Sequence, residues 1–249
     1  MLNIITFSIL GLLVGSFLNV CIYRIPRKEE IVITPSHCMT CGHTLRWYEL
    51  FPVISYIAIK GKCYKCKTHI SIQYPIIELL NGAAYMGLYL LYGISIELAI
   101  YAALFSILLI VFMIDLKTLT IPNSLVIAIG ILGLVNLVFN IVNWPQYIIG
   151  FFSVSALLFL IAIITKGKMG GGDIKLMAVA GLLLGWQRII LSLLLGSVLG
   201  AVIGLTLIGL RVVNKKALIP FGPYLAVGIM VSAIWGQVII DWYIGWIIG

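Results

Sequence analysis

Charged residues are scarce in this sequence of 249 residues, because Asp, Glu, Lys and Arg together make up only 10% of it. An average soluble domain contains about 25% charged residues. Apolar residues make up 62% of the chain, and its mean hydropathy is +1.18. This composition excludes a water-soluble globular protein, a disordered chain and a nucleic-acid-binding module. The sequence predicts a protein whose main surroundings are lipid.

Several signatures of familiar chemistry are also absent. The three histidines, His37, His43 and His69, lie in one polar segment, and no serine stands in a nucleophile-elbow pattern. The sequence contains no HExxH motif and no glycine-rich dinucleotide fingerprint. The triple glycine at 170–172 lacks the lysine and hydroxyl spacing of a phosphate loop. Serine or zinc proteolysis and nucleotide hydrolysis are therefore poorly supported.

Long apolar runs dominate the chain. A membrane helix needs about 20 mostly apolar residues, and eight runs reach or approach this length. They cover residues 2–23, 74–92, 96–114, 121–142, 145–164, 174–186, 189–210 and a last run from about 220 into the C-terminal tail. The sixth run is weak, because about 13 residues that rise 1.5 Å each reach only about 20 Å. We expect an all-α, polytopic membrane protein with about eight transmembrane helices.

The few positive charges are unevenly distributed. Lys and Arg concentrate in the cytoplasmic loops of inner or plasma membrane proteins. If residues 24–73 are cytoplasmic, fifteen of the sixteen Lys and Arg fall on that side and only Arg188 falls outside, provided that 174–186 is a span. We therefore expect a multi-pass protein with both termini outside. Residues 1–23 form the first span, 24–73 a cytoplasmic insert and 74–249 a helical bundle.

Four of the five cysteines lie in the insert as two Cys-x-x-Cys pairs, Cys38 with Cys41 and Cys63 with Cys66. Two such pairs supply four thiolates that can close a tetrahedron around Zn²⁺. In a reducing compartment, paired cysteines are more often metal ligands than disulfides. The pattern predicts a structural zinc site, with a redox pair or inert thiols as the alternative. The three histidines flank the pairs and are alternative ligands.

Only eight carboxylates are present, so each can be placed along the chain. Three of them, Glu78, Asp115 and Asp173, lie close to the inner boundary, where an ionisable residue is costly and indicates function. Asp115 ends the run 96–114, and Asp173 precedes the run 174–186. Two carboxylates held close in a partly dry site share a proton, so one can activate water as a base while the other acts as an acid.

Gly170, Gly171 and Gly172 immediately precede Asp173. Glycines permit a close approach of another backbone, so we expect an extended substrate peptide to lie against them. One alternative is a flexible loop with aspartates that cap helix ends. Another is a membrane transporter or assembly scaffold in which the aspartates relay protons.

Seven motifs follow one another through nearly the whole chain. They are GSFLNVCIYRIP at 15–26, PSHCMTCGHTLRWYELFPVISY at 35–56, GKCYKC at 61–66, YPIIELL at 74–80, Asp115 with IPN at 121–123, GGGDIK at 170–175, and IPFGPYLAVG at 219–228. In this order they resemble the type 4 prepilin peptidases. These are membrane aspartyl proteases of the GxGD kind that also act as N-methyltransferases.

The resemblance implies that Asp115 and Asp173 are the catalytic pair, that Gly170 and Gly172 are the glycines of GxGD, and that the four cysteines bind zinc. It implies cleavage of a basic leader from type IV prepilin or pseudopilin substrates at the cytoplasmic face of a bacterial inner membrane. The new N-terminus is then methylated with S-adenosylmethionine; a peptidase without methyl transfer is the alternative. We expect the methyl-transfer site near the insert and Glu78. The alternative interpretation of Glu78 is a negative charge at a helix N-terminus that interacts favourably with the helix dipole. Besides these substrates, we expect membrane lipid and no nucleic acid as partners.

Overall fold

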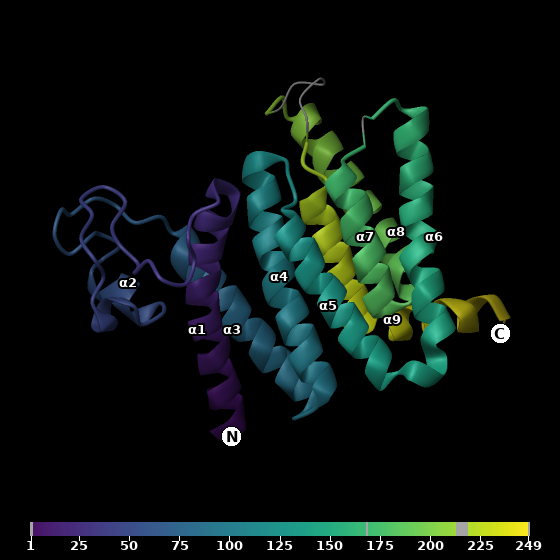
Figure 1. The fold of residues 1–249 in the computed structure, drawn as a ribbon, viewed down its shortest axis with the longest axis horizontal. Helices are drawn as coiled ribbons and strands as arrows, with labels where there is room; N and C mark the ends of the chain where they lie inside the picture. Colours follow the sequence, from purple (N-terminus) through teal and green to yellow (C-terminus); the bar gives the residue numbers. More distant parts are fainter. Residues whose placement is uncertain (1, 168, 213–218, 249) are drawn as a thin grey trace. The chain divides into compact units, whose positions relative to one another are not determined.

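The computed structural model describes residues 2–167, 169–212 and 219–248, and the regular secondary structure of these residues consists of helices, with no β-strand among them (Figure 1). Three of the basic residues that set the expected topology, Lys168, Lys215 and Lys216, lie outside the described residues. The elements are α1 (Leu2–Arg24), η1 (Ile25–Arg27), η2 (Trp47–Glu49), α2 (Ile54–Ala58), α3 (Gln73–Tyr92), α4 (Ile96–Thr118), α5 (Asn123–Phe139), η3 (Ile141–Asn143), α6 (Trp144–Ile164), α7 (Gly171–Leu184), α8 (Trp186–Gly209) and α9 (Gly222–Ile248).

A helix occupies each of the eight expected apolar runs. Within the described residues, five helical segments are long and apolar enough to cross a membrane. They are Leu2–Arg27, Ile96–Thr118, Ile141–Ile164, Trp186–Gly209 and Gly222–Ile247. The helices α3, α5 and α7 do not meet the same criteria, so a count of eight crossings remains a prediction.

The chain divides into two compact units, Met1–Ile110 and Val111–Gly249. In the first unit α1 and α3 lie side by side (Figure 1), and the segment between them forms the polar insert. The helices approach closely at Gly11, which has no side chain. A Cβ at this position would lie only 2.8 Å from the carbonyl oxygen of Asn81. Asn81 is fully buried and donates from Nδ2 to Gly11 O over 2.7 Å. Small residues and buried amides of this kind hold helices together in membranes.

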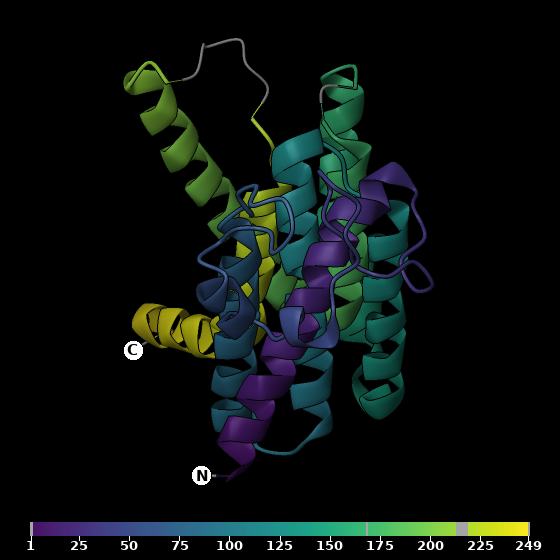
Figure 2. The same ribbon diagram turned by 90° about the vertical axis from the view of Figure 1, so that its left-hand side faces the viewer.

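In the second unit, α7 contacts α5, α6, α8 and α9. Most of its side chains are buried, as expected for a helix that is apolar on all sides. Gly150 of α6 and Gly181 of α7 approach so closely that a Cβ on either would strike the other's backbone. A helix of only 14 residues is therefore stabilised from several sides. Figure 2 shows that the C-terminal parts of α8 and α9 project away from the rest of this unit.

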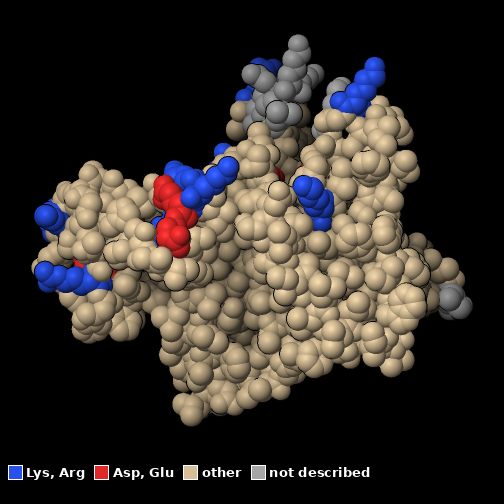
Figure 3. Space-filling view, viewed as in Figure 1, with Lys and Arg blue, Asp and Glu red and all other residues tan. Residues whose placement is uncertain are grey.

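The described basic residues of the second unit are also unevenly placed. Lys117 lies in the last turn of α4, Lys166 follows α6, Lys175 lies near the start of α7, and Arg211 follows α8. Figure 1 shows these helix ends on one side of the unit, whereas Arg188 lies at the opposite end, near the start of α8. Figure 3 shows a broad surface without charged side chains along the helices between these ends. The pattern is typical of helices with an apolar belt.

Candidate functional site

Within the second unit, the end of α4 and the start of α7 bring Asp115 and Asp173 together. Asp115 lies in the last turn of α4 and Asp173 is the third residue of α7, and their side chains are only 4% and 9% exposed. The negative charge of Asp115 acts on Asp173, although the two residues are far apart in the sequence. The sequence pattern that singled out these two carboxylates thus corresponds to one buried acidic cluster.

A backbone amide from a third element completes the surroundings of Asp115. The N–H of Gly222, the first residue of α9, donates to Asp115 Oδ2 over 3.0 Å. A Cβ at position 222 would lie 2.6 Å from the same oxygen, so any larger residue would force the carboxylate to shift. In the sequence Gly222 stands within the motif at 219–228, and no pattern there assigns it a role.

The three glycines before Asp173 have different surroundings. A Cβ on Gly170 would lie 2.6 Å from Asp173 Oδ2, and a Cβ on Gly172 would lie 3.0 Å from Cβ of Ile121. A Cβ on Gly171 would meet nothing within 4 Å. Gly170 therefore makes room for the aspartate itself, and Gly172 makes room for the segment that precedes α5.

A polar contact joins the same two segments. The ammonium of Lys175 donates to Asn123 Oδ1 over 3.1 Å, which links the GGGDIK motif to the IPN motif. Together with the packing of Gly172 on Ile121, this contact fixes the start of α7 against the start of α5. The lysine thus has a positioning contact with an amide.

In the first unit, the four cysteines of the insert form one cluster. Their sulfur atoms all lie within 4.8 Å of one another. The Sγ atoms of Cys38 and Cys66 are 3.8 Å apart, and those of Cys41 and Cys63 are 4.0 Å apart. A tetrahedron of thiolates with metal–sulfur bonds of about 2.3 Å has edges of about 3.8 Å. The cluster therefore has the dimensions of a four-thiolate metal site, and no histidine belongs to it among the described residues.

Two hairpins with the same hydrogen-bond pattern present these cysteines. In the first, Cys38 N–H donates to His43 O over 2.8 Å and Gly42 N–H donates to Cys38 O over 2.9 Å. In the second, Cys63 N–H donates to Thr68 O over 2.9 Å and Lys67 N–H donates to Cys63 O over 3.0 Å. Each loop places its two thiols on the same side.

One thiol of the cluster ionises easily. Interactions with the side chain and backbone of Thr68 lower the pKa of Cys66 from its ordinary value of 9.0 to about 6. Because the thiolate is the form that binds metals, this cysteine is prepared for ligation at neutral pH.

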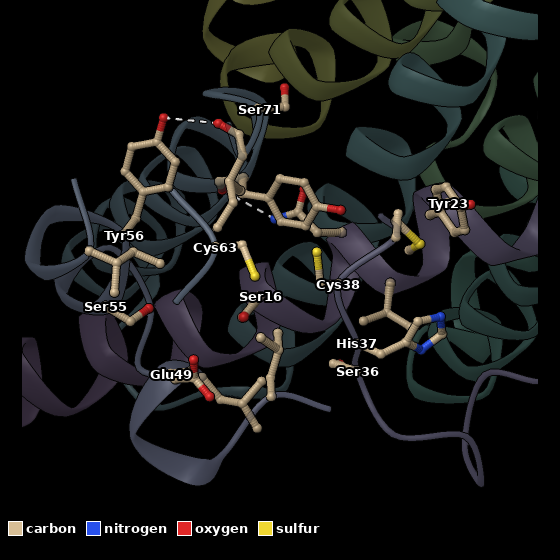
Figure 4. A pocket seen from close by; sticks show the side chains of 18 of the residues that line it. Ser16, Tyr23, Ser36, His37, Cys38, Glu49, Ser55, Tyr56, Cys63 and Ser71 are labelled. Carbon is tan, nitrogen blue, oxygen red and sulfur yellow. Dashed lines mark hydrogen bonds between the residues drawn. The ribbon is translucent and has the colours of Figure 1, made fainter. Parts of the chain in front are cut away.

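Beside the cysteines lies a cavity of about 270 Å³ (Figure 4). Its walls come from α1, α3, α2 and both hairpins. The lining includes two carboxylates, Glu49 and Glu78, and the two thiols Cys38 and Cys63. Figure 4 shows the side chains of Ser16, Cys38, Cys63 and Tyr56 around this space. The cavity lies entirely within the first unit, and it suits a small molecule rather than a single ion.

Glu78 is a buried residue that lines this cavity. Its Oε2 accepts the N–H of Val53 over 2.8 Å. Val53 has a φ of 61°, in the left-handed region that β-branched residues avoid. The carboxylate thus holds a strained turn at the start of α2, a contact that residue spacing did not reveal.

Arg24 has a structural role that sequence reasoning missed. Its guanidinium donates to the carbonyls of Glu30, Thr34 and Pro35 over 2.9, 2.7 and 3.1 Å. These bonds attach the segment after α1 to the end of that helix. In the sequence Arg24 stands out only as a topology charge, and no local pattern distinguishes it from the other basic residues of the insert.

Comparisons with known proteins cover both units. Residues 9–92 match a family model described as Bacterial Peptidase A24 N-terminal domain, and residues 102–205 match one described as Type IV leader peptidase family. A Pseudomonas putida protein named prepilin leader peptidase/N-methyltransferase is 35% identical over 258 residues, which span 92% of this chain and 90% of that protein. A Bacillus subtilis protein of the same name is 34% identical over 242 residues, 97% and 98% of the two chains. No solved structure matches the chain.

Proposed function

Because the chain belongs to the type IV leader peptidase family, we propose that it is a prepilin leader peptidase and N-methyltransferase of the inner membrane. It removes the leader from type IV prepilin-like proteins and then methylates the new N-terminus. The observation that carries the peptidase half is the buried pair of Asp115 and Asp173, brought together from the ends of two helices.

The pair is suited to aspartyl proteolysis. Two carboxylates that share a buried site also share a proton, so one is charged while the other is neutral. The charged carboxylate takes a proton from water as it attacks the scissile carbonyl, and the neutral one donates a proton to the leaving amine. The N–H of Gly222 holds Asp115 in place for this exchange.

The substrate reaches this pair along the start of α7. Gly170, Gly171 and Gly172 offer a backbone with little side-chain cover, against which the extended segment around the cleavage site lies. The adjoining apolar helix of the substrate contacts lipid and the bundle. The basic helix ends support our proposal that the pair lies at the cytoplasmic face and that both termini lie outside, because Lys and Arg concentrate on the cytoplasmic side.

Purified protein in detergent tests the peptidase proposal with a synthetic prepilin leader peptide. Asp115→Asn and Asp173→Asn should each lower leader cleavage about a hundredfold or more, because each removes one proton-transfer group. Asp241→Asn is the matched control, since Asp241 lies in α9 and accepts a hydrogen bond from Gln237. Efficient cleavage by either catalytic-site variant contradicts the assignment. An intact peptide after incubation with the wild-type protein favours a transporter or scaffold instead.

Methyl transfer is the second half of the proposed function. S-adenosylmethionine supplies an activated methyl group, and the acceptor is the amine that cleavage exposes. Mass spectrometry of the cleaved product, with and without S-adenosylmethionine, tests this half. A product one methyl group heavier supports it, whereas an unmodified product under both conditions indicates a peptidase alone.

We also propose that the insert binds one Zn²⁺ through Cys38, Cys41, Cys63 and Cys66. The spacing of the sulfur atoms fits tetrahedral thiolate ligation, and all four ligands come from the protein. A closed site of this kind leaves no position for water, so its role is to hold the two hairpins together.

A further inference from the structure

The cavity of the first unit carries two acidic side chains. Glu49 and Glu78 both line it and are 8% and 6% exposed. Among the described residues that line it, the only permanently charged cation is Arg24. The guanidinium of Arg24 already donates to three backbone carbonyls. The cavity therefore disfavours an anionic ligand such as a nucleotide phosphate and favours a cation.

Two acceptors in its walls have no hydrogen-bond partner within the described part of the chain. They are Oδ1 of Asn19 and Oε1 of Glu49. Asn19 is only 2% exposed, and its amide nitrogen is already used in a bond to Tyr74 O over 3.1 Å. A buried acceptor without a donor is costly, and this cost is removed when a bound molecule supplies the donor. Both residues line the same cavity.

Aromatic rings provide the third component of the cavity. Tyr56 and Tyr74 line it from α2 and α3. The Tyr56 hydroxyl donates to Ile70 O over 3.2 Å, which leaves the ring as the part available to a ligand. Tyrosine faces attract cations and stack on planar rings. The cavity thus combines negative charge, unpaired acceptors and aromatic surface.

From these features we infer that the cavity binds S-adenosylmethionine, with Glu49, Glu78 and Asn19 as its recognition residues. The molecule has a sulfonium and an ammonium charge for the two carboxylates, hydroxyl and amino donors for the unpaired acceptors, and a planar purine for the aromatic rings. Its single carboxylate leaves it a net cation. This inference rests on the proposed methyltransferase activity and adds the place and the residues of donor binding. It assigns methyl-donor binding to the first unit, whereas Asp115 and Asp173 belong to the second.

Glu49 also connects the cavity to the cysteine hairpins. Its Oε2 accepts the backbone N–H of Arg46 over 2.8 Å and lies 3.3 Å from His43 Nε2. The carbonyl of His43 in turn accepts the N–H of Cys38. The first hairpin therefore holds the carboxylate that recognises the donor, which gives the metal site a positioning role in methyl transfer.

Equilibrium binding of radiolabelled S-adenosylmethionine to the full-length protein in detergent tests the inference. Glu49→Gln and Glu78→Gln keep the side-chain size and remove the charge, and each should raise the dissociation constant about tenfold or more. S-adenosylhomocysteine lacks the sulfonium charge. The same two substitutions should therefore weaken its binding by a smaller factor than they weaken the binding of S-adenosylmethionine. Glu29→Gln is the matched control, because Glu29 is exposed in the same insert and does not line the cavity. Hydrogen exchange of the hairpin amides reports whether each variant has folded.

The outcomes separate this inference from the proposed function. Wild-type protein that methylates its product, with unchanged donor affinity in both folded variants, overturns the inference and leaves the function standing. Wild-type protein that neither binds the donor nor methylates its product overturns both the inference and the methyltransferase half of the proposed function, and it leaves the peptidase half standing.

Ultraviolet cross-linking of labelled S-adenosylmethionine to the wild-type protein does not depend on any variant. Label should appear in peptides that contain Tyr56 or Tyr74, and S-adenosylhomocysteine should compete with it. Label confined to residues 102–205 overturns the inference.

Discussion

The backbone N–H of Gly222 donates to Oδ2 of Asp115 over 3.0 Å, so the first residue of α9 holds a carboxylate at the end of α4. A Cβ at Gly222 would lie 2.6 Å from that oxygen and 3.0 Å from the carboxyl carbon. The contact joins two residues 107 positions apart and orients one member of the acidic pair.

Gly222→Ala should therefore impair cleavage more than folding. The new methyl group forces the Asp115 carboxylate to rotate away, and such a displacement lowers the rate of leader cleavage about tenfold to a hundredfold. Gly245→Ala in the same helix is the control, because its Cβ would meet nothing within 4 Å. Equal cleavage rates for the two variants would show that Gly222 does not orient the catalytic carboxylate.

The glycines before α7 offer a second comparison within three residues. In Gly170→Ala the added Cβ displaces Asp173 Oδ2, whereas in Gly171→Ala it enters open space. We expect leader cleavage to fall about tenfold or more in the first variant, because the aspartate is displaced, and by a smaller factor in the second, where the methyl group meets only the bound substrate. The free energy of unfolding should change by less than about 1 kcal/mol in both variants, because only the end of the Asp173 side chain must move in the first and no atom lies in the way in the second. A similar loss of cleavage in both variants would indicate a need for backbone freedom.

Metal analysis of the purified protein checks the cysteine cluster. Wild-type protein and Cys21→Ala should contain one zinc per chain, because Cys21 lies in α1 outside the cluster. Cys63→Ser should lose the metal, since removal of one thiolate opens the tetrahedron. Hydrogen exchange should then rise in residues 36–45 and 61–70, where the two hairpins depend on the metal. Full zinc content in Cys63→Ser would exclude the four-thiolate site.

Arg24 provides a test of the insert's attachment to α1. Lysine keeps the positive charge but lacks the planar fork that reaches three carbonyls. Arg24→Lys should lower the free energy of unfolding by about 2 kcal/mol and increase hydrogen exchange in residues 28–37, because buried carbonyls lose their donors. Arg27→Lys makes the same change at an exposed position and should have a much smaller effect. Unchanged exchange in Arg24→Lys would mean that the segment is held by other contacts.

The structure refines several predictions made from sequence. The run 174–186 is too short to span a bilayer by itself, and α7 is indeed a helix of 14 residues, surrounded by helices of its own unit. Glu78 was identified as an acidic residue near the insert, but its bond to Val53 and its place in the cavity wall were not foreseen. Asn19 did carry a signal, since an amide within an apolar run indicates a buried polar contact.

The sequence by itself determined the helices, the paired cysteines and the identity of the two unusual aspartates. Each of these depends on local properties, namely the length of an apolar run, a short spacing or the scarcity of acidic residues. Only the tertiary structure decided that Gly222 contacts Asp115, that Arg24 binds three carbonyls, and that Glu49 and Asn19 line one cavity. These relationships arise where helices and loops distant in sequence meet, and the spacing of residues along one chain does not contain that geometry.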